Sequence, residues 1–175
     1  GIYNTLIGGQ AGDALTTGNK NVAIGKSALS AEDAHTGNVA VGYYALRDLD
    51  AGADAYNTAV GFEAGRLMST GIYNTVMGSA AGDALTTGSY NVAIGYTALS
   101  TEDSHGRNTA VGYAALILQD AGADAYNTAI GFAAGQAVST GIKNTILGGE
   151  AGDALTTGDN NIIIGWNAAA SAVGV

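Results

Sequence analysis

The stretch NTAVGFEAG, residues 57–65, decides the fold because its pattern recurs along the whole chain. Each copy begins with Asn, has Gly four residues later and has Ala seven residues later. Successive Asn residues are separated by 17, 17, 19, 17, 17, 17, 19, 17 and 17 residues. This regular spacing predicts ten similar coils. Their first residues are Asn4, Asn21, Asn38, Asn57, Asn74, Asn91, Asn108, Asn127, Asn144 and Asn161.

A longer repeat of 70 residues is superimposed on the coils. The sequence AGDALTTG occurs at 11–18, 81–88 and 151–158, and DAGADAYNTA occurs at 50–59 and 120–129. Internal repeats at a fixed period are typical of solenoids. We therefore expect one domain over residues 1–175, made of two full units (1–70 and 71–140) and a half copy (141–175).

Composition and charge exclude several classes of function. The chain has 175 residues, a net charge of −9 and only six Lys and Arg residues, so it lacks the basic stripe of a nucleic-acid binder. The most apolar stretch, 162–175, is too short to cross a bilayer, which argues against membrane insertion. There are 28 Gly, no Pro and no Cys. The first residue is not Met and no signal peptide is evident, so we expect a segment of a longer chain.

Within each coil, the pattern predicts a short β-strand that ends in a turn. β-Branched residues alternate with small residues directly after Asn, with a spacing of two rather than 3.6. The large aliphatic residue three after Asn is expected to fill the inside of the coil. A second, weaker strand is expected in DALTTG, where Leu15, Leu85 and Leu155 recur. The fold class is therefore an all-β parallel β-solenoid, or β-roll, of about ten coils.

The recurring Asn and Gly are expected to have structural roles. Asn tolerates turn conformations, and stacked Asn side chains can form a ladder of amide hydrogen bonds from one coil to the next. Gly allows a positive φ or a close backbone approach. These Gly residues are Gly8, Gly25, Gly42, Gly61, Gly78, Gly95, Gly112, Gly131, Gly148 and Gly165.

A single chain has a thin core, because each coil supplies only two or three large side chains. We therefore expect self-association as a side-by-side homotrimer. Exposed aromatic residues could seal the contacts between chains: Tyr3, Tyr43, Tyr44, Tyr73, Tyr90, Tyr96 and Tyr113.

The repeats resemble two known families of fibrous proteins. NVAIGKSAL (21–29), NTAVGFEAG (57–65) and NIIIGWNAA (161–169) are similar to the repeats of trimeric autotransporter adhesin heads. They are closer still to the Asn-Thr-Ala-Ile-Gly-x-x-Ala-Leu repeats of bacteriophage tail fibres, which often precede an intramolecular chaperone domain. The resemblance covers all ten coils, although the coils of adhesin heads are shorter. It implies a trimeric β-roll used for attachment to a cell surface.

Few residues suggest chemistry. The clusters AEDAH (Glu32, Asp33, His35) and TEDSH (Glu102, Asp103, His105) could bind a metal, but a solvated loop is the expected state. Asp13, Asp83 and Asp153 have the wrong spacing for a calcium β-roll. We expect no catalytic residue, no metal and no cofactor, and therefore no enzyme. The best candidates for contact loops, in the two 19-residue coils, are Asp50, Asp54, Tyr56, Asp120, Asp124 and Tyr126, with Asp48 beside them.

The leading hypothesis is a structural and adhesive segment of a phage tail fibre or surface adhesin, located outside the cell or on the virion. Its partners would be further copies of itself and a cell-surface glycan or receptor. One alternative is a monomeric ice-binding solenoid, although its Thr rows are interrupted. Another is an extracellular filament that assembles end to end. The tail 167–175 is expected to be a junction or a cap.

Overall fold

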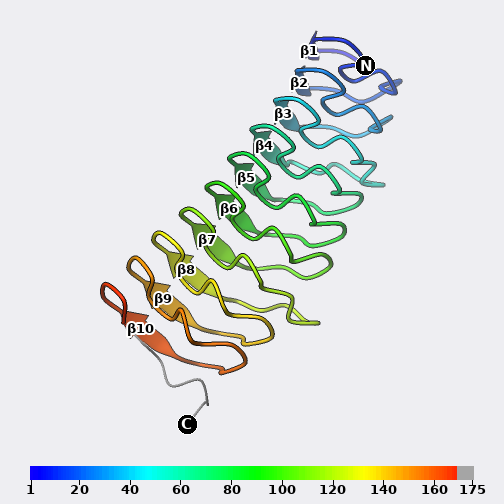
Figure 1. The fold of residues 1–175 in the computed structure, drawn as a ribbon. Coiled ribbons are helices and arrows are strands. Elements are labelled where there is room, and N and C mark those ends of the chain that lie inside the picture. Colours follow the sequence, from blue (N-terminus) through cyan, green and yellow to red (C-terminus); the bar gives the residue numbers. More distant parts are fainter. Residues whose placement is uncertain (169–175) are drawn as a thin grey trace.

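The chain folds into a parallel β-solenoid, which confirms the predicted fold class. The computed structural model describes residues 1–168, so the tail proposed as a junction or cap lies almost wholly outside the described part. Each coil contributes one three-residue strand, and ten strands stack in sequence order into one parallel sheet (Figure 1). They are β1 (Thr5–Ile7), β2 (Val22–Ile24), β3 (Val39–Val41), β4 (Thr58–Val60), β5 (Thr75–Met77), β6 (Val92–Ile94), β7 (Thr109–Val111), β8 (Thr128–Ile130), β9 (Thr145–Leu147) and β10 (Ile162–Ile164).

The second strand expected in DALTTG is not formed. Residues 11–14 and 81–84 form turns, and no strand lies between β1 and β2 or between β5 and β6. Leu85 is nevertheless fully buried, because the turn directs its side chain into the coil. A turn in each coil can bury one Leu without an extended segment, so a recurring Leu does not by itself indicate a strand.

The register of the sheet places equivalent positions of neighbouring coils directly beside each other. Thr58 of β4 pairs with Thr75 of β5, and Val60 pairs with Met77. Every neighbouring pair of strands has this in-register arrangement. Neighbouring strands in a sheet lie about 4.8 Å apart. The ten coils therefore form a rod roughly 45 Å long, in which each residue type continues as a row.

The ladder of Asn side chains connects each coil to the next. Each Asn Oδ1 accepts a hydrogen bond from the backbone N–H of the following ladder Asn, at 2.8–3.1 Å, over all nine steps. Most Asn Nδ2 groups donate to the carbonyl oxygen 14 residues later. The ladder thus joins side chain to backbone, whereas the expected ladder joined amide to amide.

At two coils an insertion removes the hydrogen bond of the Asn Nδ2 group, while the Oδ1 bond is kept. Asn38 and Asn108 begin the two 19-residue coils, and their buried Nδ2 groups have no hydrogen-bond partner within residues 1–168. The two additional residues displace the carbonyl group that would accept this bond. The inserted segments 52–54 and 122–124 are exposed, as expected for an outward bulge.

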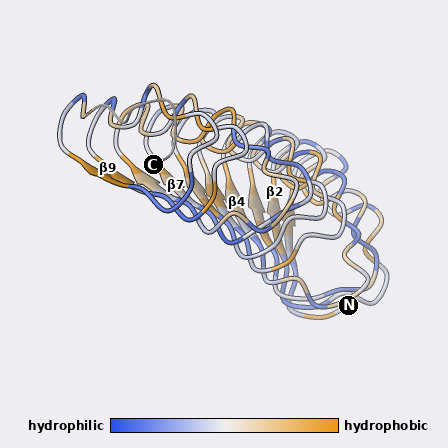
Figure 2. Cartoon of the chain, turned by 90° about the horizontal axis from the view of Figure 1, so that it is seen from below, coloured by the Kyte–Doolittle hydropathy of each residue, from blue (hydrophilic) through white to orange (hydrophobic). Residues whose placement is uncertain are grey.

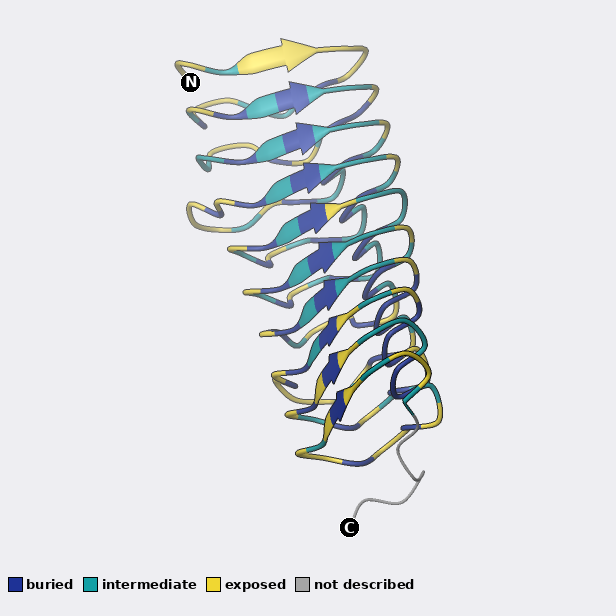
Figure 3. Cartoon of the chain, turned by 90° about the vertical axis from the view of Figure 1, so that its left-hand side faces the viewer, coloured by how far each residue is buried: buried dark blue, intermediate teal, exposed yellow. Residues whose placement is uncertain are grey.

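The core contains different residues from those predicted. The large aliphatic residue three after Asn points outward: Met77 is 40% exposed and Leu147 is 45% exposed. The residue two after Asn is buried instead, as the dark middle of almost every strand shows in Figure 3. The prediction was wrong because side chains alternate along a strand. Since Asn is buried, the residue two after it must also face inward.

Side chains at two positions of a coil complement each other in volume. Where the residue eight after Asn is Leu, as in Leu29 and Leu99, the residue two after Asn is Ala. Where that position is Gly82 or Gly152, the inward strand residue is the larger Val76 or Ile146. In the coils of Asn57 and Asn127 both positions are small, with Ala59 beside Gly65 and Ala129 beside Gly135, so the exchange holds in some coils and not in all.

Candidate functional site

The outer face of the sheet is a continuous, partly exposed surface along the rod. The strand residues one and three after Asn point outward, and apolar residues follow the strands along the surface (Figure 2). One row contains six Thr, three Val and one Ile, and the other contains only aliphatic residues and Met. Contiguous apolar surface of this kind marks an interaction site in soluble proteins.

Stacked aromatic rings flank this outer face. Before the strands, Tyr73 stacks on Tyr56 and on Tyr90, with ring centroids 5.6 and 5.2 Å apart. After the strands, Tyr113 stacks on Tyr96 and on Phe132, at 5.5 and 5.0 Å. These rings are half exposed, so they extend the apolar face on both sides. Of the Tyr residues predicted to seal contacts, Tyr44 alone is directed partly into the protein.

The acidic loops proposed as contact surfaces are exposed. Asp50, Asp54 and Tyr56 are exposed in the first 19-residue coil, and Asp120, Asp124 and Tyr126 are exposed in the second. Asp54 also lines an open groove of about 420 Å³ near the N-terminus, together with Tyr3 and Lys20.

Asp124 in the second acidic loop is held by an ion pair with Arg107, which the first loop lacks because Gly37 occupies the position of Arg107. Arg107 Nε donates to Asp124 Oδ2 at 2.7 Å and the backbone N–H of Gly106 donates to Asp124 Oδ1 at 3.0 Å. These contacts lower the pKa of the Asp124 carboxyl, the hydrogen bond from Arg107 contributing most. The Arg107 guanidinium also lies over the rings of Tyr90 and Tyr126. Gly37 occupies the equivalent position in the first unit, so the two loops differ in charge.

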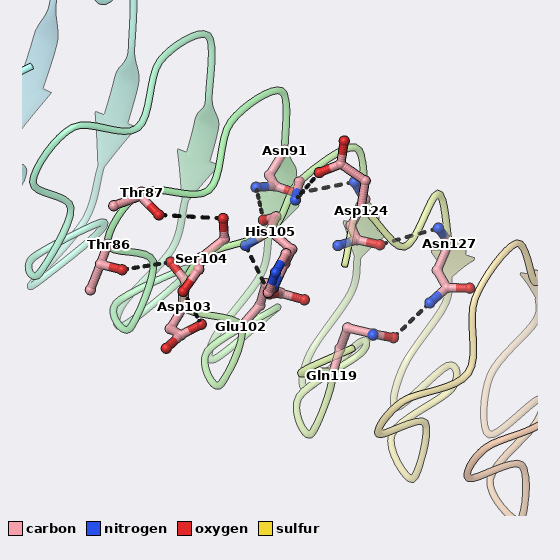
Figure 4. A network of polar contacts seen from close by, with 12 residues as sticks. Thr86, Thr87, Asn91, Glu102, Asp103, Ser104, His105, Gln119, Asp124 and Asn127 are labelled. Atoms are coloured by element: carbon pink, nitrogen blue, oxygen red, sulfur yellow. Dashed lines mark hydrogen bonds and ion pairs between the residues drawn. The ribbon is translucent and has the colours of Figure 1, made fainter. Parts of the chain in front are cut away.

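The two Glu–His clusters are solvated only in part: Asp33 and Asp103 are exposed, as expected for a solvated loop, whereas the Glu side chains are not. Glu32 and Glu102 are fully buried. Glu32 Oε1 accepts hydrogen bonds from the backbone N–H of His35 at 3.0 Å and contacts His35 Nδ1 at 2.7 Å. In the second cluster, Glu102 Oε1 accepts the backbone N–H of His105 at 3.2 Å (Figure 4). Burial raises the pKa of the Glu102 carboxyl, and contacts with His105 partly oppose this effect.

The structure adds one residue to each cluster that the sequence did not connect with it. Asp50 and Asp120 come from the next coil, and their carboxylates complete two groups: Glu32, Asp33, His35 and Asp50, and Glu102, Asp103, His105 and Asp120. One potential ligand atom from each residue lies within 4.8 Å of the others. Asp50 and Asp120 had been assigned only to contact loops. The signal that could have connected them is their position twelve after Asn, which Asp33 and Asp103 also occupy.

Comparisons with known proteins give no further assignment. The chain matches no protein-family model, no curated protein and no solved structure. Within residues 1–168 there is no helix with the length and hydrophobicity that a membrane span requires.

Proposed function

We propose that this chain is a structural and adhesive segment of a fibre, such as a phage tail fibre or a surface adhesin, in which three copies pack side by side. The observation that supports this proposal is the exposed apolar face of the sheet, flanked by aromatic ladders along the rod. A partner for such a face must present apolar groups at the same spacing of about 4.8 Å. A second copy of this chain has that spacing.

We infer three copies from the resemblance of the repeat sequence to trimeric fibres. The Asn-Thr-Ala-Val-Gly pattern resembles that of trimeric fibres, and three rods can enclose their apolar faces around one axis. The acidic segments at 50–54 and 120–124 would then remain accessible as contact surfaces for a cell-surface glycan or receptor, while the Tyr56 ring stays in the ladder beside the sheet. Attachment would occur outside the cell or on a virion.

The solution mass of the full chain tests this proposal. Light scattering on a size-exclusion column should give three times the chain mass of 17.2 kDa. Replacing Ile94 and Val111 with Glu places two charges on the outer face and should yield monomers with an unchanged circular dichroism spectrum. Thr17→Glu with Thr157→Glu adds the same charge in exposed turns and should leave the trimer intact. A single-chain mass for the unmodified protein at high concentration would refute the trimer.

A monomeric ice-binding solenoid is the second candidate. The observation that favours it is the outward Thr and Val row on a flat, regularly spaced sheet. If the chain is monomeric, inhibition of ice recrystallisation should be measured next, with Thr75→Leu and Thr109→Leu as variants of the face. A broad mass that rises with concentration would instead favour end-to-end assembly through β1 and β10.

A further inference from the structure

Equivalent positions of successive coils form rows along the solenoid, and in three of these rows the residue type changes at the same place in each 70-residue unit. The row eleven after Asn contains Leu15, Leu49, Met68, Leu85, Gln119, Val138 and Leu155, but Glu occupies it at 32 and 102. The row twelve after Asn is Thr or Ser except for the neighbouring pairs Asp33–Asp50 and Asp103–Asp120. Fourteen after Asn, where five 17-residue coils have Gly, His35 and His105 appear.

Each of these changes is unfavourable by itself. A carboxylate replaces an apolar side chain in the core, and burial of a charge without compensation is costly. The second carboxylate oxygens of Glu32 and Glu102 are buried and have no hydrogen-bond partner within residues 1–168. Such unsatisfied groups are rare in native proteins. They indicate that a cation belongs beside them.

The stacked Asp residues point to the same conclusion. Residues at equivalent positions of neighbouring coils lie about 4.8 Å apart, so each Asp pair brings two like charges together. Like charges at this distance repel each other, and a cation between them would relieve the repulsion. Elsewhere in this row, Thr and Ser hydroxyls donate hydrogen bonds to the next coil, as Thr86 does to the carbonyl oxygen of Asp103.

We propose that each cluster binds one divalent transition-metal ion of the zinc type, through the Glu carboxylate, the His imidazole and the Asp of the next coil. For the first site these residues are Glu32, His35 and Asp50, with Asp33 at the rim. For the second they are Glu102, His105 and Asp120, with Asp103 at the rim. Each ion would connect two neighbouring coils at the point where the Asn ladder loses a hydrogen bond.

The distances suit one shared ion. Zinc binds imidazole nitrogen and carboxylate oxygen at about 2.0–2.2 Å, which places two ligand atoms roughly 3–3.6 Å apart. His35 Nδ1 lies 2.7 Å from Glu32 Oε1 and 4.0 Å from Asp50 Oδ1. His105 Nδ1 lies 3.4 Å from Glu102 Oε1 and makes no hydrogen bond within residues 1–168. In the first site the ion would replace the His35–Glu32 hydrogen bond and widen that pair to the spacing of zinc ligands, and in both sites the exposed Asp side chain would move toward the imidazole.

The choice of ligands favours zinc-type ions over calcium or magnesium. Imidazole suits Zn, Cu, Fe and Ni, whereas Mg and Ca prefer oxygen ligands alone. The two units also keep the same ligands while their neighbours differ: AEDAHTG at 31–37 corresponds to TEDSHGR at 101–107. The Glu, Asp and His residues are retained, and the residues that change are those before, between and after them.

Titration of the full, untagged chain with ZnCl2 tests this proposal. Because the chain has only two His residues, calorimetry should report two Zn²⁺ ions per chain for the unmodified protein, one for His35→Gln and none for His35→Gln with His105→Gln. The matched control Asp54→Asn, in the same loop as Asp50, should still bind two. CoCl2 should give a visible absorption band that the double variant lacks, and saturating Zn²⁺ should raise the melting temperature only where sites remain.

Three results would overturn the proposal. They are the absence of zinc binding by the unmodified chain, an unchanged stoichiometry in the double His variant, and CaCl2 or MgCl2 binding as tight as that of ZnCl2. If the His variants fail to fold, Asp50→Asn with Asp120→Asn removes the exposed ligands without a change in the core and should also lose tight binding. Glu102, Asp103 and His105 lie in a loop away from the strands (Figure 4), and Glu32, Asp33 and His35 also lie outside the strands, so this result is independent of the number of chains in the fibre.

Discussion

At the scale of single residues, the solenoid depends on side chains that connect one coil to the next. The ladder Asn shows this best, because its buried amide satisfies backbone groups of two different segments. Asn74 Oδ1 accepts the N–H of Asn91 at 2.8 Å, and Asn74 Nδ2 donates to the carbonyl oxygen of Gly88 at 2.9 Å. Gly78, four residues later, has a φ of +130°, and a Cβ there would lie 2.5 Å from the carbonyl oxygen of Gly95. Any side chain at that position would separate the coils.

Replacing Asn74 with Ala should therefore destabilise the rod strongly. Two buried backbone groups would lose their partners, at a cost of about 1–3 kcal/mol each, so we expect a loss of about 2–6 kcal/mol. Urea unfolding followed by circular dichroism measures this loss. Asn19→Ala is the matched control, because Asn19 makes one hydrogen bond, to the exposed first coil. Equal losses for the two variants would show that the ladder contributes no special stability.

At the scale of the element, each coil is one short strand and a set of turns around a small core. The core consists of the inward strand residue and two turn residues, such as Ala93, Leu99 and Glu102 in the coil of β6. In several coils the volumes at two of these positions are complementary, as in Ala93 with Leu99 and Val76 with Gly82.

Much of this arrangement could be predicted from the sequence, because the Asn, Gly and Ala positions repeat at a fixed period. The inward face was not predicted correctly. The larger residue of each strand was placed inside, whereas alternation from the buried Asn puts the smaller one there. The sequence combines the small Ala93 with Leu99 in one coil and the larger Val76 with Gly82 in another. This combination indicates that the residue two after Asn faces inward. The burial of Glu32 and Glu102 was missed for a related reason, since they occupy a row that is otherwise mostly apolar and so faces inward.

Leu99→Ala tests the core that the structure defines. Leu99 is fully buried, and truncation of a buried Leu leaves a cavity that costs about 2–5 kcal/mol. Leu118, in the turn of the next coil, is 53% exposed, so Leu118→Ala should change the free energy of unfolding by less than about 0.5 kcal/mol. The two midpoints of urea unfolding give the comparison. Similar values would mean that the inner surface of the coil has been assigned to the wrong residues.

At the scale of the whole molecule, the rod is nearly one-dimensional. Each coil contacts the coils before and after it, and every strand pairs only with its neighbours in sequence. The stability of such proteins is approximately a sum over repeats and their interfaces. It should therefore be possible to remove one 70-residue unit, because this block of four coils begins and ends at equivalent positions of a coil.

Deletion of residues 71–140 should give a shorter rod with the same fold. The deletion joins Thr70 to Gly141 and so recreates the Thr–Gly sequence that is present at both boundaries of the unit. Six coils remain, so the rod should shorten by about 19 Å, at about 4.8 Å per coil. The urea m-value should fall in proportion to the surface that is buried, while the circular dichroism signal per residue stays unchanged. The second Glu–His cluster is removed with the deleted unit, so zinc stoichiometry should fall from two ions to one per chain. A deleted chain that is unfolded would show instead that the coils depend on distant parts of the rod, and it would contradict the nearest-neighbour architecture.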